Sequence, residues 1–451
     1  NSDLITEIKP SKSAPLFGFW YPACLSSELP PDSLKGTVLL GLPILVCKTS
    51  QGAVAAMRDI CPHRGMPLSF GKMEGDCVEC AYHGWQFDQA GRCRGIPALV
   101  ENSSIQVDKI GITTYACRER DGYVWVFVPD PQQPNQTIPD VPPLPLPSSP
   151  YRMIHISTLL DCTIDDGIVG LMDPAHGPFV HQSSWWRTKA SIHEKAKTFE
   201  PIPNGFRMVP HAPSTNSGPY KLLNLFYGGP LTTTIDFVLP NQRFEFVQCG
   251  SLFVSSRATV TPISDQQCRI DFTAAWNCLS WVPFSKTIFC YFANIFMTQD
   301  REAMERQAVG LRYKPSLMLI DDADTPAKWY YKLKAAHLAS AQTGQPLDHP
   351  LKERVRSLEE LAARLAGKAQ LVKQAEVFGS PTLAFSLLPF SLRIALVARL
   401  THFSPICTKS SIACLIWTRV PINTTISPAV SRIFSDGFAC VTPACVQAIT
   451  E

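Results

Sequence analysis

The stretch Cys61-Pro62-His63-Arg64-Gly65 and the stretch Cys80-Ala81-Tyr82-His83 decide how this chain folds. Residues 64–79 separate the first His from the second Cys. Each stretch supplies one Cys and one His, and each lies where a predicted strand turns. Two Cys and two His in two short loops form a metal-ligand set. We therefore expect a fold that brings these two loops together around metal.

Two metal chemistries fit these four residues. One Cys and one His from each loop can give two thiolates to one iron and two imidazoles to the other iron of a [2Fe-2S] cluster. The same set also suits tetrahedral Zn²⁺. Zinc ligand pairs are more often Cys-x-x-Cys with His-x-x-x-His than mixed Cys-x-His loops, so the spacing favours the iron cluster.

A second candidate metal site lies in the stretch Asp173-Pro174-Ala175-His176-Gly177-Pro178-Phe179-Val180-His181. On a regular helix the two His would point about 140° apart, but we expect Pro178 to break the helix between them. Two imidazoles and one carboxylate leave open positions on Fe(II) for O₂ and substrate. The alternative interpretation is that Asp173 caps a helix with Pro174 at its first position, and that both His are ordinary loop residues.

The two Cys/His loops resemble the Rieske domain of the ring-hydroxylating oxygenases, and Pro62, Arg64, Gly84 and Trp85 fit that family as well. The resemblance implies that Cys61 and Cys80 bind the inner iron of the cluster, and that His63 and His83 bind the outer iron. Rieske proteins of respiratory chains usually join the two loops by a disulfide. The first loop has no second Cys, which favours the oxygenase type.

The second stretch resembles the catalytic motif of the same family, Asp-x-x-His followed by His four or five positions later. The resemblance implies that His176 and His181 bind a mononuclear Fe(II). It also implies that Asp173 links His176 to His83 of the partner subunit, which predicts a ring-shaped homotrimer. Many relatives have Asn or an acidic residue where this chain has Gly170. The Asp-Pro-Ala-His segment also resembles the pheophorbide a oxygenase-like branch of the family.

The third ligand of the mononuclear iron is expected far along the chain. Asp300, at the start of a predicted helix, is our choice because it resembles the family's late Asp or Glu. Acidic residues are also favoured at helix N-termini by the helix dipole alone. Glu302, Glu305 and Asp321 are therefore competing candidates.

The strand and helix patterns predict an α+β protein with two folded domains. Residues 16–129 are expected to form an all-β Rieske domain, 130–150 a Pro-rich linker, and 151–371 a catalytic domain with an antiparallel sheet. The resemblance implies a helix-grip (Bet v 1/START-like) fold for that second domain. The expected strands include 37–47, 122–128, 206–209, 220–226, 231–239, 243–247, 251–263 and 269–276, and the expected helices are 159–181, 299–311, 324–338 and 351–371.

Residues 372–451 differ from the rest, because no Asp or Glu occurs between Glu376 and Asp436. Pro381 and Pro389 interrupt the most apolar part, so we expect no spanning helix. We expect no membrane association, and a membrane-surface amphipathic segment is the alternative. We interpret this tail as disordered or non-native.

Composition narrows the partners and the compartment. A net charge of +3 over 451 residues, with no Lys/Arg-rich run, argues against nucleic acid. The 16 cysteines are scattered, which indicates a reducing, cytoplasmic setting. The first residue is Asn1, and a plastid is the alternative if a targeting segment has been removed.

The sequence thus predicts a Rieske-type mono- or dioxygenase with a [2Fe-2S] cluster and a mononuclear Fe(II). No Gly-x-Gly-x-x-Gly motif opens a βαβ unit, so electrons from NAD(P)H must come through a separate reductase or ferredoxin. The expected reaction with O₂ is hydroxylation, dihydroxylation or demethylation of an aromatic or polycyclic substrate. The alternatives are a tetrapyrrole oxygenase, an iron-sulfur electron-transfer protein and a zinc-binding interaction protein.

Overall fold

The computed structural model describes residues 5–8, 14–133, 135–147, 150–181, 198–212, 230–277, 282–320, 323–345 and 347–351. The expected strand at 220–226, the expected helix at 351–371 beyond its first residue, and the tail at 372–451 lie outside the described residues. All described residues belong to one compact unit, 1–355.

The first domain is built on two antiparallel sheets whose buried apolar side chains form its core. The expected strand at 37–47 is in fact a hairpin. Leu40 and Gly41 both have positive φ at its turn, and this tight turn reverses the chain inside a continuous apolar run. The elements are β2 (Phe19–Leu25), β11 (Cys117–Arg120) and β12 (Tyr123–Val128) in one sheet, β3 (Ser33–Leu39), β4 (Leu42–Lys48), β5 (Val54–Arg58) and β10 (Thr114–Tyr115) in the other, and the 3₁₀ turn η1 (Ser26–Glu28).

A smaller four-stranded sheet carries the two Cys/His loops. The first loop follows β5, and the second loop joins β7 to β8. Cys61 and Cys80 are both part of the apolar core beneath this sheet. Its elements are β6 (Lys72–Glu74), β7 (Cys77–Glu79), β8 (Gln86–Phe87) and β9 (Cys93–Gly95), with the 3₁₀ turns η2 (Leu68–Phe70) and η3 (Val107–Lys109) nearby.

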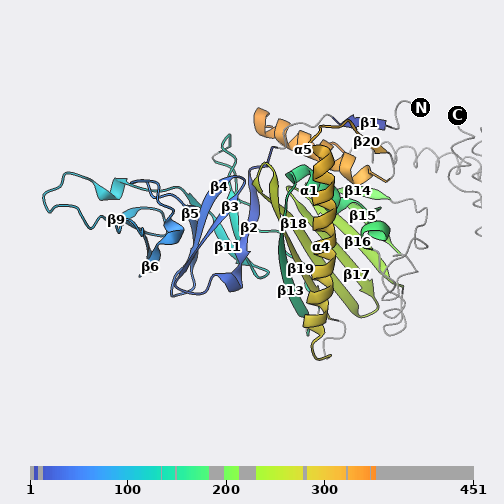
Figure 1. The fold of residues 1–451 in the computed structure, drawn as a ribbon, viewed down its shortest axis with the longest axis horizontal. Helices are drawn as coiled ribbons and strands as arrows, with labels where there is room; N and C mark the ends of the chain where they lie inside the picture. The colour runs from blue at the N-terminus through green and yellow to red at the C-terminus, as the bar shows by residue number, and fades with distance from the viewer. Residues whose placement is uncertain are drawn as a thin grey trace, which may run out of the picture. The chain divides into compact units, whose positions relative to one another are not determined.

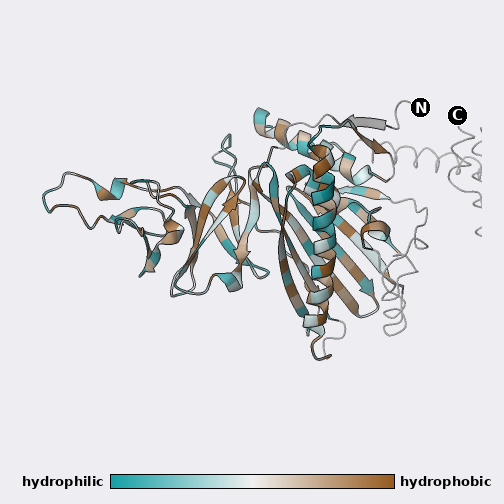
Figure 2. Ribbon diagram, viewed as in Figure 1, coloured by the Kyte–Doolittle hydropathy of each residue, from teal (hydrophilic) through white to brown (hydrophobic). Residues whose placement is uncertain are grey.

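The second domain is a seven-stranded antiparallel sheet with helices packed on it, so the α+β prediction is confirmed. The long helix α4 lies across this sheet (Figure 1), and its Phe289 stacks on Trp276 of β19. Figure 2 shows hydrophobic residues along these strands and a mixture of hydrophobic and hydrophilic residues along α4. In sheet order the strands are β13 (Arg152–Leu160), β19 (Gln267–Trp276), β18 (Leu252–Ser264), β17 (Gln242–Cys249), β16 (Thr232–Val238), β15 (Gly205–His211) and β14 (Phe199–Ile202). The helices are α1 (Ile164–Met172), α2 (Gly177–Val180), α4 (Ser285–Leu311) and α5 (Thr325–Thr343), and β1 (Ile5–Ile8) pairs with β20 (Leu317–Ile320).

Two helix predictions were wrong in their bounds. The segment 159–181 was expected to be helical, but it contains the end of β13, then α1, then α2. The helix expected to start at 299 starts at Ser285. Strands β13, β14, β1 and β20 were not expected.

The last strand of the first domain ends at Val128, and the first strand of the sheet domain starts at Arg152. The boundaries at 129 and 151 stay a prediction. Arg257 of β18 is 1% exposed and pairs with Asp121 at 3.1 Å. Its guanidinium also lies 4.6 Å from the ring centre of Trp125. The two domains are therefore joined by a buried charge contact.

Candidate metal centres

The two Cys/His loops have the same backbone hydrogen bonds. The Cys61 N–H donates to the Met66 carbonyl, and the Gly65 N–H donates to the Cys61 carbonyl. In the second loop the Cys80 N–H donates to Trp85, and the Gly84 N–H donates to Cys80. Gly65 has φ +74° and Gly84 has φ +68°, a conformation that other residues adopt at a cost. The two glycines therefore shape two matching turns.

The side chains of the first site separate into a buried thiol pair and an outer imidazole pair. Cys61 and Cys80 are buried and their thiols contact each other. The rings of His63 and His83 lie 4.5 Å apart, edge to face, and Trp85 stacks on His63 at 4.8 Å. Thiols inside and imidazoles outside are what a cluster with one thiolate-bound and one imidazole-bound iron needs.

Burial raises the pKa of the Cys61 thiol, and the neighbouring Cys80 raises it further. Burial also lowers the pKa of the His83 imidazole, helped by the positive charges of His63 and Arg64. A neutral imidazole is the form that binds metal.

The four residues of the first site do not gather around one point. Four donors of a tetrahedral zinc ion, with bonds of about 2.0–2.3 Å, lie within about 4 Å of one another. Among the residues that the structure describes, one group has three candidate donor atoms within 4.8 Å of one another. It consists of His176, His181 and Asp300, which belong to the second site. The Cys/His set is not among the groups of described residues that meet this spacing.

The second site starts where α1 ends. Residues before Pro avoid the helical region, and Asp173, before Pro174, is extended with φ −66° and ψ 117°. Its carboxylate accepts a hydrogen bond of 2.7 Å from the Ala175 N–H. Asp173 thus ends one helix, whereas the alternative interpretation had it capping the start of another.

The two His of the motif flank the four-residue helix α2, with His176 as its N-cap and His181 as its C-cap. The prediction that Pro178 breaks the helix between them was wrong, because Pro178 lies in the first turn of α2, where Pro is tolerated. The two imidazoles converge because His181, with ψ 38°, has already left the helical path.

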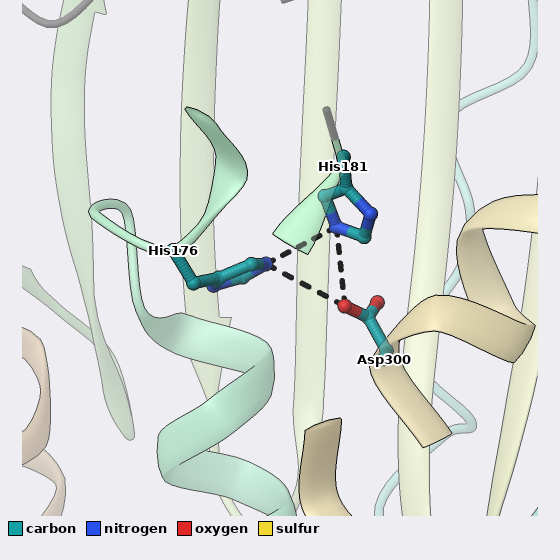
Figure 3. Close-up of side chains that lie close together, drawn as sticks. All are labelled: His176, His181 and Asp300. Atoms are coloured by element: carbon teal, nitrogen blue, oxygen red, sulfur yellow. Dashed lines mark hydrogen bonds and ion pairs between the residues drawn. The ribbon is translucent and has the colours of Figure 1, made fainter. Parts of the chain in front are cut away.

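Figure 3 shows the imidazoles of His176 and His181 and the carboxylate of Asp300 turned toward one another. The two Nε2 atoms are 3.2 Å apart. Asp300 Oδ1 lies 3.1 Å from Nε2 of His181 and 3.6 Å from Nε2 of His176. Three donors bound at right angles with bonds of about 2.1 Å would be about 3 Å apart. The three residues therefore fit one face of a divalent ion and leave the opposite face open.

Asp300 lies in the middle of α4, so no helix N-terminus explains its place. Of its competitors, Glu302 pairs with Arg306 at 3.0 Å, and Glu305 with Arg301 at 3.6 Å, both on the exposed side of α4. Asp321 lies outside the described residues.

Gly170 permits close contact between α1 and α4. A Cβ at this position would lie 2.8 Å from Sδ of Met304, which is one helical turn beyond Asp300. The absence of a side chain at Gly170 therefore lets the helix before His176 approach the helix that carries Asp300.

Sequence reasoning missed two contacts of His181. Its Nδ1 lies 3.0 Å from Oε1 of Gln299, and its ring lies 4.5 Å from the ring of Phe296. Both residues belong to α4, and the one signal that pointed to Gln299 was its position beside Asp300.

Two surface hollows differ in their relation to these sites. The larger one, about 190 Å³, is lined by Trp20, Pro139 and their neighbours and contacts none of the candidate ligands. The smaller one, about 30 Å³, is lined by Met172, Asp173, Pro174, Phe199, Phe206, Met208, Ile235 and Arg243. Of the two hollows, the smaller one is next to the candidate iron motif, because Asp173 and Pro174 line it.

Residues 19–116 match the Rieske [2Fe-2S] domain family. The chain is 36% identical over 174 residues to chlorophyllide a oxygenase, a chloroplastic protein of Chlamydomonas reinhardtii, which covers 38% of this chain and 25% of that protein. It is 38% identical over 116 residues to the iron-sulfur subunit of a toluene-4-sulfonate monooxygenase system of Comamonas testosteroni, covering 26% of this chain and 32% of that subunit. Residues 19–116 therefore carry a Rieske [2Fe-2S] domain, and the chain is similar in sequence to oxygenases.

The fold of this chain is similar to that of dicamba monooxygenase in its crystal structure with bound dicamba. The TM-score is 0.58 at 22% identity, over 71% of this chain and 98% of that chain. The chain spans between 25% and 47% of the length of the curated relatives. Its activity, substrate and partners are therefore matters of proposal. No helix among the described residues is both long and apolar enough to cross a membrane.

Proposed function

We propose that this chain is the oxygenase component of a Rieske system, which uses O₂ and electrons from a separate reductase or ferredoxin to oxidise an organic substrate. The observation that carries the proposal is the convergence of His176, His181 and Asp300 in a chain that also has a Rieske domain. A protein that only transferred electrons would not need this second site.

The residues of each site define what it would hold. Cys61 and Cys80 would bind the inner iron of the cluster, and His63 and His83 the outer iron. His176, His181 and Asp300 would hold the mononuclear Fe(II). When bound, the cluster supplies electrons and the mononuclear iron supplies the centre at which O₂ is activated.

The surrounding chain orients and shields this second site. The His181 side chain is 10% exposed and packs on Phe296, which limits the access of water. Asp173 Oδ2 lies 3.6 Å from Nδ1 of His176, on the side of the ring away from the other ligands. This placement supports the proposed role of Asp173 in linking His176 to the cluster of a partner subunit, and with it the homotrimer.

We propose a ring-containing substrate that is hydroxylated, dihydroxylated or demethylated. The names of the relatives, among them chlorophyllide a oxygenase, 4beta-methylsterol monooxygenase and dicamba O-demethylase, support this class. The tetrapyrrole alternative rests on the similarity to chlorophyllide a oxygenases from an alga and two plants. We propose a cytoplasmic location, and the chloroplastic relatives support the plastid alternative.

The test uses the full chain with its cluster assembled, a generic reductase and NADH, and O₂ consumption over aromatic, steroid and tetrapyrrole compounds. In the His176→Ala variant we expect substrate oxidation to fall by at least about 100-fold, since loss of a ligand costs at least as much as loss of its supporting contacts. The visible absorption of the cluster should stay unchanged.

The matched control is His211→Ala, which removes a His of β15 whose Nδ1 contacts a backbone carbonyl. It should oxidise substrate like the wild type. Full activity in His176→Ala with an intact cluster would refute the oxygenase proposal and favour an iron-sulfur electron-transfer protein. Zinc without iron or acid-labile sulfide in the purified chain would refute both.

A further inference from the structure

His181 is contacted at both nitrogens of its ring by two consecutive residues of α4. Its Nε2 faces Asp300 Oδ1 at 3.1 Å, and its Nδ1 faces Gln299 Oε1 at 3.0 Å. The ring itself is nearly buried against Phe296. One turn of α4 therefore supplies both a candidate ligand and a contact to the back of another ligand.

The identity of the Gln299 atom decides which tautomer of His181 is stable. A neutral imidazole carries one proton, and the nitrogen without it is the one that can bind metal. Oε1 of an amide can only accept a hydrogen bond, so its partner Nδ1 must carry the proton. The lone pair is then on Nε2, the atom that faces Asp300 and His176.

We propose that Gln299 is a positioning residue, which accepts the Nδ1 proton of His181 and so fixes the tautomer and the ring orientation needed for binding iron. This inference rests on the proposed mononuclear iron site. Contacts of this kind behind a ligand imidazole set its tautomer and raise its basicity.

The two ligand imidazoles are supported differently. Behind His176 lies the charged carboxylate of Asp173, with 3.6 Å between Oδ2 and Nδ1. Behind His181 lies a neutral amide at hydrogen-bonding distance. Gln299 thus orients His181 without adding negative charge beside Asp300, so the ligand set keeps a single carboxylate.

Iron binding tests this role apart from turnover. The full chain, with its cluster assembled and oxidised, is stripped of mononuclear metal and titrated with Fe(II). Binding is followed through the EPR signal of the Fe(II) adduct with nitric oxide. In Gln299→Leu we expect the Kd for Fe(II) to rise about 10- to 100-fold and the signal to broaden, because the ring has lost its acceptor.

Two further variants make the test specific. Gln299→Glu keeps an acceptor oxygen in place and should bind Fe(II) at least as tightly as the wild type. Gln307→Leu makes the same substitution at an exposed position of α4 and should bind like the wild type.

The outcomes separate this inference from the proposed function. Wild-type binding and an unchanged signal in Gln299→Leu would overturn the positioning role alone. An equal loss of Fe(II) affinity in Gln299→Leu and Gln299→Glu would also overturn it. A hydrogen-bond acceptor at position 299 would then not be enough to keep His181 in its binding form. A wild-type chain without a His176-dependent iron signal would overturn the oxygenase proposal and this inference together.

Discussion

Asp300 is the residue on which the proposed mononuclear iron site depends most. Among the described residues, its carboxylate is the one that lies within 4 Å of both imidazoles, at 3.1 and 3.6 Å. In Asp300→Asn we expect affinity for Fe(II) to fall by at least about 100-fold, because the amide oxygen has the same shape but no charge. Iron content after desalting, with the cluster counted separately by its absorption, measures the loss.

Glu302→Gln is the control for Asp300→Asn, since it makes the same kind of change on the exposed side of the same helix. Iron content should be unchanged in this variant. If Asp300→Asn retained its mononuclear iron while Glu302→Gln lost it, the third ligand would be Glu302, one of the competing candidates.

At the residue scale, what could be predicted from sequence depended on distance along the chain. The two Cys/His loops and the pair His176 and His181 could be recognised because each set lies within a few residues. Asp300 could be chosen only through the family resemblance. Gln299 could not be found, because a Gln on a helix has no pattern of its own and its role depends on a contact with a residue 118 positions away.

Helix α4 shows why element bounds were less predictable than element types. Its first half, Ile288-Phe289-Cys290-Tyr291-Phe292, is rich in β-branched and aromatic residues typical of strands. In the fold Phe289 stacks on Trp276 of the sheet and Cys290 packs against the same core, so tertiary contacts override local preference. Only the polar second half, from Gln299 on, was recognisable as helix.

A buried ion pair fixes α1 against α5. Lys334 Nζ lies 2.6 Å from Oδ1 of Asp165, and the Tyr330 hydroxyl donates to the same oxygen at 2.5 Å. Burial, and then the Asp165 charge, raise the pKa of Tyr330 well above its usual value, so it remains a donor. Helix α1 leads directly into Asp173 and His176, so this pair holds in place the helix that precedes the proposed iron motif.

Removing one partner of this ion pair should destabilise the folded protein. In Lys334→Met we expect the free energy of unfolding to fall by about 3–5 kcal/mol, because Asp165 is left buried without its cation. Urea unfolding followed by circular dichroism measures it. Lys332→Met, on the exposed side of the same helix, should change stability by less than about 0.5 kcal/mol. Equal losses of unfolding free energy in the two variants would show that the ion pair of Lys334 and Asp165 does not stabilise the fold.

At the scale of the whole molecule, two imidazoles lie where the domains meet. His155 of β13 lies edge to face with Tyr123, with ring centres 5.2 Å apart. His337 of α5 contacts Phe19, with ring centres 4.8 Å apart. Burial lowers the pKa of His155, helped by Lys286 and Arg257 and opposed by Asp121. Burial also lowers the pKa of His337, opposed by the Phe17 backbone and by Asp130.

These shifts predict a loss of stability in acid. Below about pH 6.5 the unfolded chain protonates both residues while the folded chain resists, so the unfolded state binds more protons and stability falls as pH falls. The stability is fully present above this pH. We expect the double variant His155→Gln/His337→Gln to lose less stability between about pH 7.5 and pH 5.5 than the wild type. Urea unfolding at both pH values measures this loss. If the double variant lost as much stability as the wild type, His155 and His337 would not be the cause of the acid sensitivity.

The proposed iron ligands come from two parts of the fold, a short stretch around α2 and the helix α4 that crosses the sheet. An ion held by all three residues would join these elements, and the unfolded chain, in which they are far apart, could not bind it equally well. An ion that binds only the folded chain stabilises it by about 2.7 kcal/mol when present at a hundred times its Kd. The amount of folded protein in a cell would then follow the iron supply, and iron starvation would remove the protein itself as well as its activity.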